Sequence, residues 1–317
     1  MTIRRSRALS RRQLLTGLGA AASLGLLRPK LGAAADRPTG AVTALAFDSG
    51  MLVVAADGFW TSSDGGATLT LRSGQPGSAV TAMATHPARP GLIYATGATG
   101  GLSRSDDGGH TWRDAGAGLP QAPTDAVAIA AHEPDTIYVA VRGDGLWQSR
   151  DGAESWEFVM DRPLEDKVER DLLALASVSS PSGMGGYWVF AGTGKGVTKV
   201  PDCFCRWSGI GNDGAMDALV SGRQSTPAAP SLRLPREPAS SLALAPTVPN
   251  VLFAGLPSGI WKSGDTGETW QLVMAALASP SLAVNPLDPN HIVAAAADGT
   301  ILSSRDGGLT WAAPAAA

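Results

Sequence analysis

Short aliphatic runs alternate with glycine- and proline-rich turns along most of this chain, from about residue 41 to the C-terminus. A typical unit begins with a run such as Val42–Phe47 or Ser281–Val284, followed by a proline-containing turn and a second run such as Ile137–Ala140. A glycine then opens a third run, as in Gly145–Trp147. Short runs at this spacing, separated by turn residues, are typical of antiparallel all-β structure.

Each unit continues through a polar box with the pattern Ser-x-Asp-x-Gly-x-Thr-Trp. The box aspartates are separated by 43, 44, 51, 63 and 41 residues, and five of the six are followed five positions later by tryptophan. The fourth box keeps only its aspartate and tryptophan. The six aspartates are Asp64, Asp107, Asp151, Asp202, Asp265 and Asp306. An internal repeat of this period indicates a propeller or an array of small structural units.

The composition of the box predicts a tight turn between two strands. Its carboxylate can accept hydrogen bonds from backbone N–H groups of its own turn, and its glycine permits a positive φ. The tryptophan then begins a fourth strand and buries a large apolar area against neighbouring strands. We therefore interpret the box aspartates as structural residues and not as catalytic ones.

The box resembles the Asp-box, or BNR repeat, of sialidases, sortilin-type receptors, xyloglucanases and the photosystem II stability/assembly factor family. The resemblance extends over about residues 41 to 312 and bears mainly on the fold, because this repeat occurs in enzymes and non-enzymes alike. The final unit, Ala297–Gly308, is most similar to the assembly-factor branch. That branch, usually seven-bladed, implies a role in the maturation of a membrane or electron-transfer complex.

Six units of four strands predict an all-β fold, a six-bladed β-propeller with antiparallel blades. A seventh blade would need an unrecognised repeat between Asp202 and Asp265, which makes seven blades the alternative. We expect a single propeller domain over residues 36–317, with an insertion at about residues 211–238.

Antiparallel connectivity places the first and third turns of every blade at one end, and the second turns and blade-to-blade connections at the other. We call these ends the box face and the second-turn face. The first turns contain His86, His132 and His291. Function commonly lies on the loops of a rigid scaffold, and the two long connections, Asp161–Asp171 and about 211–238, belong to the second-turn face. The candidate partner or ligand residues are Asp57, Arg142, Asp144, Lys195, Arg233 and Asp298. Solvated loops without a partner are the alternative.

The first 35 residues predict an export signal. The paired Arg11 and Arg12 precede the apolar stretch Gly17–Leu27, which ends before the small residues Ala33–Ala35. This stretch is shorter than the roughly 20 residues that cross a bilayer, and small residues after it form a cleavage pattern. The pattern is typical of a twin-arginine signal peptide, with an ordinary signal peptide or a short buried helix as alternatives. We expect a periplasmic or secreted protein.

The leader conceals how acidic the rest of the chain is. The 317 residues carry a formal charge of -3, but the leader holds seven basic residues and no acid. The remainder has 18 basic against 28 acidic residues, a net charge of -10. Because an acidic domain is repelled by phosphate backbones, nucleic acid is excluded as a partner.

Residues suited to catalysis are sparse. A sialidase needs a tyrosine nucleophile, but Tyr94, Tyr138 and Tyr187 all lie in second-strand patterns. A glycosidase of another type needs two carboxylates at a fixed separation, whereas Glu165 and Glu169 are interleaved with basic residues as on a solvated face. The histidines are not paired at metal-ligand spacing, so we expect no metal and no cofactor.

Cys203 and Cys205 are the only cysteines of the chain and replace part of the fourth box. In an oxidising compartment they can form a disulfide. Two structural thiols in a turn, or a soft-metal or redox pair, are the alternatives.

These features predict an exported, monomeric, non-catalytic binding or assembly scaffold, with an unknown protein or glycan of the cell envelope as its partner. A carbohydrate-active enzyme, a glycosidase-like hydrolase or a lyase, is the alternative. An acidic pair at the mouth of the central channel would favour the enzyme, and an apolar rim would favour the scaffold.

Overall fold

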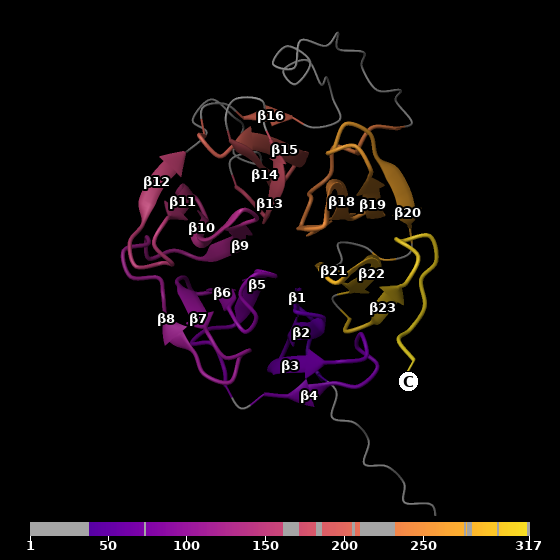
Figure 1. Cartoon of the computed structure of the whole chain (residues 1–317), viewed down its shortest axis with the longest axis horizontal. Coiled ribbons are helices and arrows are strands. Elements are labelled where there is room, and N and C mark those ends of the chain that lie inside the picture. Colours follow the sequence, from indigo (N-terminus) through magenta and orange to yellow (C-terminus); the bar gives the residue numbers. More distant parts are fainter. Residues whose placement is uncertain are drawn as a thin grey trace, which may run out of the picture. The chain divides into compact units, whose positions relative to one another are not determined.

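The aliphatic runs of the repeat form antiparallel strands, and four runs in succession form one twisted sheet. In the computed structural model these sheets are the blades of a six-bladed β-propeller (Figure 1). The structure describes residues 38–72, 74–160, 171–181, 186–204, 207–209, 232–275, 277, 281–296 and 298–315. All of these residues belong to the compact unit Ala35–Ala317.

The strands follow one another from the centre of the propeller outward within each blade. Blade 1 contains β1 (Ala44–Asp48), β2 (Met51–Ala55), β3 (Phe59–Ser62) and β4 (Thr70–Leu71). Blade 2 contains β5 (Val80–Thr85), β6 (Ile93–Gly97), β7 (Leu102–Ser105) and β8 (Arg113–Asp114). Blade 3 contains β9 (Thr124–Ala130), β10 (Glu133–Val141), β11 (Gly145–Ser149) and β12 (Glu157–Met160).

The second half of the chain repeats this order. Blade 4 contains β13 (Ala174–Pro181), β14 (Tyr187–Thr193), β15 (Gly196–Pro201) and β16 (Ser208–Gly209). Blade 5 contains β17 (Ser241–Ala245), β18 (Val248–Leu256), β19 (Gly259–Ser263) and β20 (Gln271–Met274). Blade 6 contains β21 (Ser281–Asn285), β22 (Asp288–Ala295) and β23 (Ile301–Ser304).

The innermost strands close the ring. β1, β5, β9, β13, β17 and β21 contact one another in cyclic order, and β21 contacts β1. Between the last blade and the first, the Ser281 hydroxyl donates a hydrogen bond to the Thr43 carbonyl at 3.1 Å. Leu45 and Val54 of blade 1 also pack with Val293 of blade 6. The predicted six-bladed, all-β fold is therefore confirmed.

The core lies between the blades, because each blade buries both of its faces against its neighbours. Trp270, for example, packs with Trp188 and Leu252 between blades 4 and 5, and its side chain is 1% exposed. Its indole Nε1 donates to the Gly267 carbonyl of its own box at 2.9 Å. A buried tryptophan thus joins the turn to the core, as its size and single donor favour.

Three details differ from the sequence prediction. The outer strands begin one residue after the box tryptophan, because the tryptophan itself completes the turn; β8 starts at Arg113 and β20 at Gln271. Blade 6 has three strands, and a bridge between Ser303 and Ala312 forms its outer edge. His291 lies inside β22 and not in the preceding turn.

None of the described segments forms a helix with the length and apolar character that spanning a bilayer requires. The predicted leader, residues 161–170 of the first long connection and residues 210–231 of the insertion lie outside the described residues.

Candidate functional site

The box turns use their carboxylates locally. In blade 2, the Ser105 hydroxyl donates to Asp107 Oδ1 at 2.8 Å, while the Thr111 backbone N–H and hydroxyl donate to the two carboxylate oxygens at 2.9 and 2.6 Å. Gly109 N–H donates to the Ser105 hydroxyl at 2.8 Å. The same pattern recurs around Asp64, Asp151, Asp265 and Asp306.

These hydrogen bonds favour the ionised carboxylate. They hold the pKa of Asp107, Asp151 and Asp306 at about 2, and the largest contribution comes from the hydroxyl at the threonine position of each box. A carboxylate that is permanently ionised and enclosed by its own turn is a poor general acid. The box aspartates therefore hold the turn together.

The fourth box has Val200 at the position where the other five have serine, so it lacks the serine hydroxyl. Phe204, at the position of the box glycine, has a positive φ of 53°. The Asp202 carboxylate lies 3.8 Å from Nε2 of His132, and the His132 ring stacks on Tyr187 at 3.9 Å. Asp202 is thus directed toward the first turn of blade 3. Cys205 lies outside the described residues, so its disulfide with Cys203 stays a prediction.

Backbone hydrogen bonds join the box turns to the start of the second strand of the same blade. Gly108 N–H donates to the Gly91 carbonyl at 3.0 Å, and Gly152 N–H donates to the Asp135 carbonyl at 2.9 Å. First and third turns therefore share the box face. The second turns and the blade connections lie at the opposite end, because consecutive strands are antiparallel.

The acidic candidates on the second-turn face are held by local hydrogen bonds. Asp57 accepts from the backbone N–H and the hydroxyl of Thr39, and Asp144 accepts from Trp147 Nε1 at 2.6 Å. Asp298 accepts from Thr300 N–H at 2.9 Å. The hydrogen bonds to Asp57 and Asp298 lower the pKa of both carboxyls, so these groups are ionised near neutral pH. Asp144 and Asp298 therefore hold their own turns, and Asp57 ties its turn to Thr39, which precedes β1 in the chain.

The basic candidates lie on three different segments of this face. Arg142 forms an ion pair with Asp125 of β9, with Nε 2.9 Å from Oδ2; the Arg142 side chain is 58% exposed and that of Asp125 is 10% exposed. This pair raises the pKa of Arg142. Lys195 lies in the β14–β15 turn, and Arg233 follows the part of the insertion that lies outside the described residues. The acidic candidates Asp57, Asp144 and Asp298 lie in the second turns of blades 1, 3 and 6.

The central channel is lined by the innermost strands and is largely apolar. Alanine, leucine and valine side chains dominate it, with hydroxyls such as Thr43, Thr81 and Ser281 toward the second-turn face. Cavities of about 160 and 80 Å³ lie along the channel. Among the described residues that line these cavities, the titratable side chain is His86 and there is no carboxylate.

The histidines of the box face are mostly structural. His86 and His291 are 6% and 2% exposed, and burial lowers the pKa of both rings. His291 packs edge-on against Phe47, with ring centroids 5.1 Å apart. Across the described ranges, no group of three or more His, Cys, Asp or Glu side chains is arranged to hold a metal ion.

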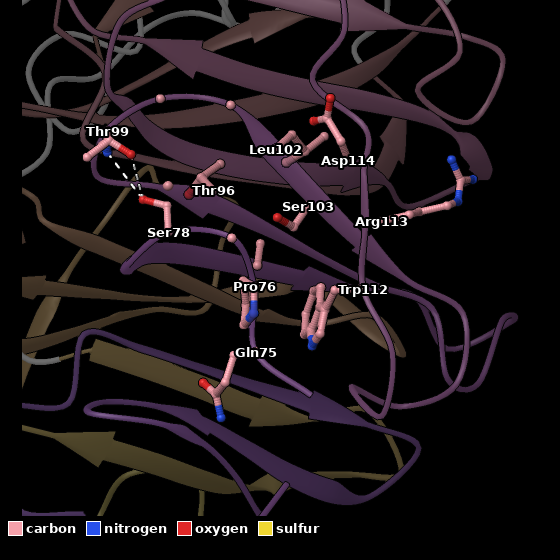
Figure 2. Close-up of a pocket in the computed structure, with 15 residues that line it drawn as sticks. Gln75, Pro76, Ser78, Thr96, Thr99, Leu102, Ser103, Trp112, Arg113 and Asp114 are labelled. Carbon is pink, nitrogen blue, oxygen red and sulfur yellow. Dashed lines mark hydrogen bonds between the residues drawn. The ribbon is translucent and has the colours of Figure 1, made fainter. Parts of the chain in front are cut away.

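A cavity that the sequence analysis did not identify opens at the second-turn end of blade 2 (Figure 2). Its volume is about 410 Å³, and its walls come from the connection Gln75–Ser78, the β6–β7 turn and strands β7 and β8. The labelled side chains include Ser103, Trp112 and Asp114. The signal in the sequence is Ser103, which stands where three other units have tryptophan.

Comparison with solved structures finds the same fold in several proteins. The chain is similar to the GH74 xyloglucanase from Xanthomonas campestris, at 17% identity and a TM-score of 0.52 over 88% of this chain and 54% of that chain. It is also similar to a structural genomics protein of unknown function from Bacteroides thetaiotaomicron, at 10% identity and a TM-score of 0.60 over 84% and 69% of the two chains. YCF48 from Cyanidioschyzon merolae aligns at 14% identity with a TM-score of 0.48, over 87% and 85%.

At these identities the similarity shows the fold alone, and the YCF48 alignment is too weak to support an argument about function. This chain spans about half the length of the GH74 xyloglucanase and 46% of the GH74 enzyme from Niastella koreensis. No family model and no curated protein matches the sequence.

Proposed function

We propose that this chain is a non-catalytic binding or assembly scaffold of the Asp-box propeller type, exported by the twin-arginine pathway to act in the cell envelope or outside the cell. The observation that carries the proposal is that the carboxylates already accept hydrogen bonds from other residues of the chain. Five box aspartates accept hydrogen bonds within their own turns, Asp57, Asp144 and Asp298 accept hydrogen bonds from neighbouring residues, and no carboxylate lines the described part of the channel.

A glycosidase requires a carboxylic acid whose pKa is raised, together with a second carboxylate at a defined distance. The shifts resolved for carboxyl groups in the described part of the chain are all downward, as for Asp57, Asp107 and Asp298. Such groups are ionised bases and hydrogen-bond acceptors. This electrostatic character favours recognition over acid catalysis.

The second candidate function is a carbohydrate-active enzyme, which is favoured by the propeller fold shared with GH74 enzymes. Its catalytic acids would have to come from segments such as 161–170, where Glu165, Asp166 and Glu169 lie outside the described residues. Such an enzyme would need an acid pair at the second-turn face.

Capture of partners from the cell envelope, together with a polysaccharide panel, tests both candidates. The full chain, expressed with its leader and a C-terminal tag, is cross-linked in whole cells, and each captured protein is confirmed by reciprocal capture. We expect a specific protein or glycan to be retained without any release of reducing sugar. If the native chain hydrolyses a polysaccharide and Glu165→Gln or Glu169→Gln does not, the result contradicts the scaffold function and favours the enzyme.

A further inference from the structure

The third strand of the blade has a repeated position that tryptophan occupies in blades 1, 3 and 5. Trp60, Trp147 and Trp261 occupy it, and they pair across the sheet with Val54, Val139 and Ala254 of the second strand. On their other side they pair with apolar residues of the outer strand, which are Leu71, Phe158 and Leu272. Trp147 and Phe158 are in edge-to-face contact, with ring centroids 5.5 Å apart.

The second turn supplies an acceptor for this indole. Asp144 Oδ2 accepts from Trp147 Nε1 at 2.6 Å, and the Ser258 hydroxyl accepts from Trp261 Nε1 at 3.0 Å. In both blades the acceptor is three residues before the tryptophan. Blades 3 and 5 therefore each contain an indole site that has apolar walls and a hydrogen-bond acceptor for the ring nitrogen.

Blade 2 lacks the tryptophan and its acceptor. Ser103 pairs with Ala95 of β6 and with Asp114 of β8, which puts it in the tryptophan position. Three residues earlier, the acceptor position is Gly100, with a φ of 103°. The outer-strand residue has changed as well, because Asp114 replaces the leucine or phenylalanine of the other blades.

The missing side chain leaves an open space. In blade 1, a Cβ atom on Gly58 would lie 3.1 Å from Trp60 Nε1 and 2.7 Å from Leu71 Cδ1. At Gly101 of blade 2, which has a φ of 85°, a Cβ atom would meet no atom within 4 Å outside that glycine and its two neighbours. The cavity of about 410 Å³ occupies this place, bordered by Ser103, Trp112 and Asp114 (Figure 2).

Blade 4 also lacks the tryptophan, because Thr198 pairs with Ala191 at the corresponding place. Leu234 does not replace the indole there. It packs with Trp188 and Val197, which lie on the opposite face of the same sheet.

We propose that the blade 2 cavity receives an aromatic side chain, above all a tryptophan, that the protein partner presents from an exposed segment. The cavity lies at a position that holds an indole in three other blades, and the aromatic Trp112 is one of the residues that line it. Asp114 and Ser103 provide oxygen acceptors for a ring N–H or O–H at the base of the inserted side chain. This inference rests on the proposed binding function and names the chemistry of the partner.

Titration of the full chain with N-acetyl-L-tryptophanamide tests the cavity without any knowledge of the partner. Calorimetry measures the affinity, and backbone amide spectra locate the site. We expect saturable binding that shifts the Gly100 and Gly101 amides, with little response to N-acetyl-L-leucinamide or methyl glucoside. Ser103→Trp restores the side chain of the repeat and should weaken binding at least tenfold, which corresponds to about 1.4 kcal/mol.

Leu302→Trp is the matched control, because Leu302 occupies the same position in blade 6; it should leave binding unchanged. If Ser103→Trp does not fold, Asp114→Leu, which copies blades 1 and 5, should narrow the cavity and weaken binding. The proposal is overturned if the native chain does not bind the tryptophan probe, if Ser103→Trp binds it as tightly, or if the glucoside occupies the cavity in preference.

Capture of partner proteins from the cell envelope distinguishes a failure of the aromatic docking site from a failure of the proposed scaffold function. Loss of the captured partner in Ser103→Trp supports both. Equal capture by the native chain and Ser103→Trp retains the scaffold function and overturns the aromatic docking site. Probe binding without any captured partner contradicts the scaffold function.

Discussion

At the residue scale, aspartate and tryptophan divide the work of each box. The carboxylate gathers the donors of the turn, as Asp265 does with Ser263 and Thr269, and the indole anchors that turn in the core. Two kinds of interaction therefore stabilise the same few residues. They respond to different perturbations, since one depends on ionisation and the other on apolar burial.

Trp270→Ala should lower the free energy of unfolding by roughly 3–5 kcal/mol, because it removes a buried indole and leaves a cavity between blades 4 and 5. Chemical denaturation measures the change. Leu272→Ala is the control, because this side chain is 39% exposed and its loss should cost much less. Equal losses in the two variants would contradict the packing described for the box tryptophan.

The box carboxylates should make the fold sensitive to acid. The pKa of Asp151 falls from 3.8 to about 2 on folding, so its contribution to stability is fully present above about pH 4 and is lost as the pH falls through about 2. The melting temperature of the native chain should therefore decrease over that interval. Asp151→Asn should show a smaller decrease relative to its own value at pH 5. Parallel curves for the two proteins would show that the turn is not stabilised by the ionised carboxylate.

At the element scale, the blade is a repeated frame whose individual positions vary. The sequence pattern predicts strand number, strand order and the box turns, because these depend on apolar periodicity and on local turn chemistry. It did not identify the blade 2 cavity. A missing side chain is visible only when strand register shows that Ser103 and Trp147 occupy corresponding places.

The same limit applies to the candidate site. The sequence places three candidate aspartates in turns, namely Asp57, Asp144 and Asp298. Such a position is compatible with a binding surface and also with a carboxylate that accepts hydrogen bonds from the chain itself. In the structure Asp144 and Asp298 accept hydrogen bonds within their own turns, and Asp57 accepts one from Thr39. His86 and His291 occur near prolines in the sequence, yet they are buried because their surroundings pack against the ring. Burial of such residues depends on contacts between blades, which a single-chain pattern does not contain.

Trp147→Ser should reproduce the blade 2 cavity in blade 3. We expect a loss of about 2–4 kcal/mol in the free energy of unfolding, toward the lower end of large-to-small substitutions because Trp147 is only partly buried. Added indole should then raise the melting temperature of the variant, since a ligand that binds only the folded state stabilises it. The native chain serves as control for blade 3. Failure of indole to stabilise the variant would mean that the position does not form an indole-shaped space.

At the scale of the whole molecule, the ring is closed by contacts between blades 1 and 6, and its two faces differ in character. On the box face, the box turns of blades 1, 2, 3, 5 and 6 repeat one hydrogen-bonded pattern. The second-turn face carries the variable elements, among them the ion pair of Arg142 with Asp125 and the blade 2 cavity. Variation on one face of a regular frame is the arrangement expected of a binding scaffold.

Export should depend on the paired arginines of the leader. Arg11→Lys combined with Arg12→Lys should retain the precursor in the cytoplasm, because this arginine pair defines the predicted twin-arginine signal. Immunoblots of cytoplasmic and exported fractions measure the outcome, and Arg4→Lys combined with Arg5→Lys is the control for charge-conserving changes elsewhere in the leader. Export of the Arg11/Arg12 variant at the normal level would contradict the proposed route.

Partner binding should separate the two faces. Arg142→Gln and Lys195→Gln remove cations from the second-turn face and should weaken the captured partner's affinity severalfold. Arg142→Gln also leaves the largely buried Asp125 without its cation, so the single variants and Asp125→Asn with Arg142→Gln must be compared in thermal melts.

The control variants belong on the box face. His86 and His132 are unsuitable for this purpose, because His86 is buried and His132 stacks on Tyr187. Arg150 and Arg305 are exposed beside the boxes of blades 3 and 6, and their change to glutamine should leave affinity unchanged. If the Arg150 and Arg305 variants lose the partner while the Arg142 and Lys195 variants retain it, the binding surface is the box face.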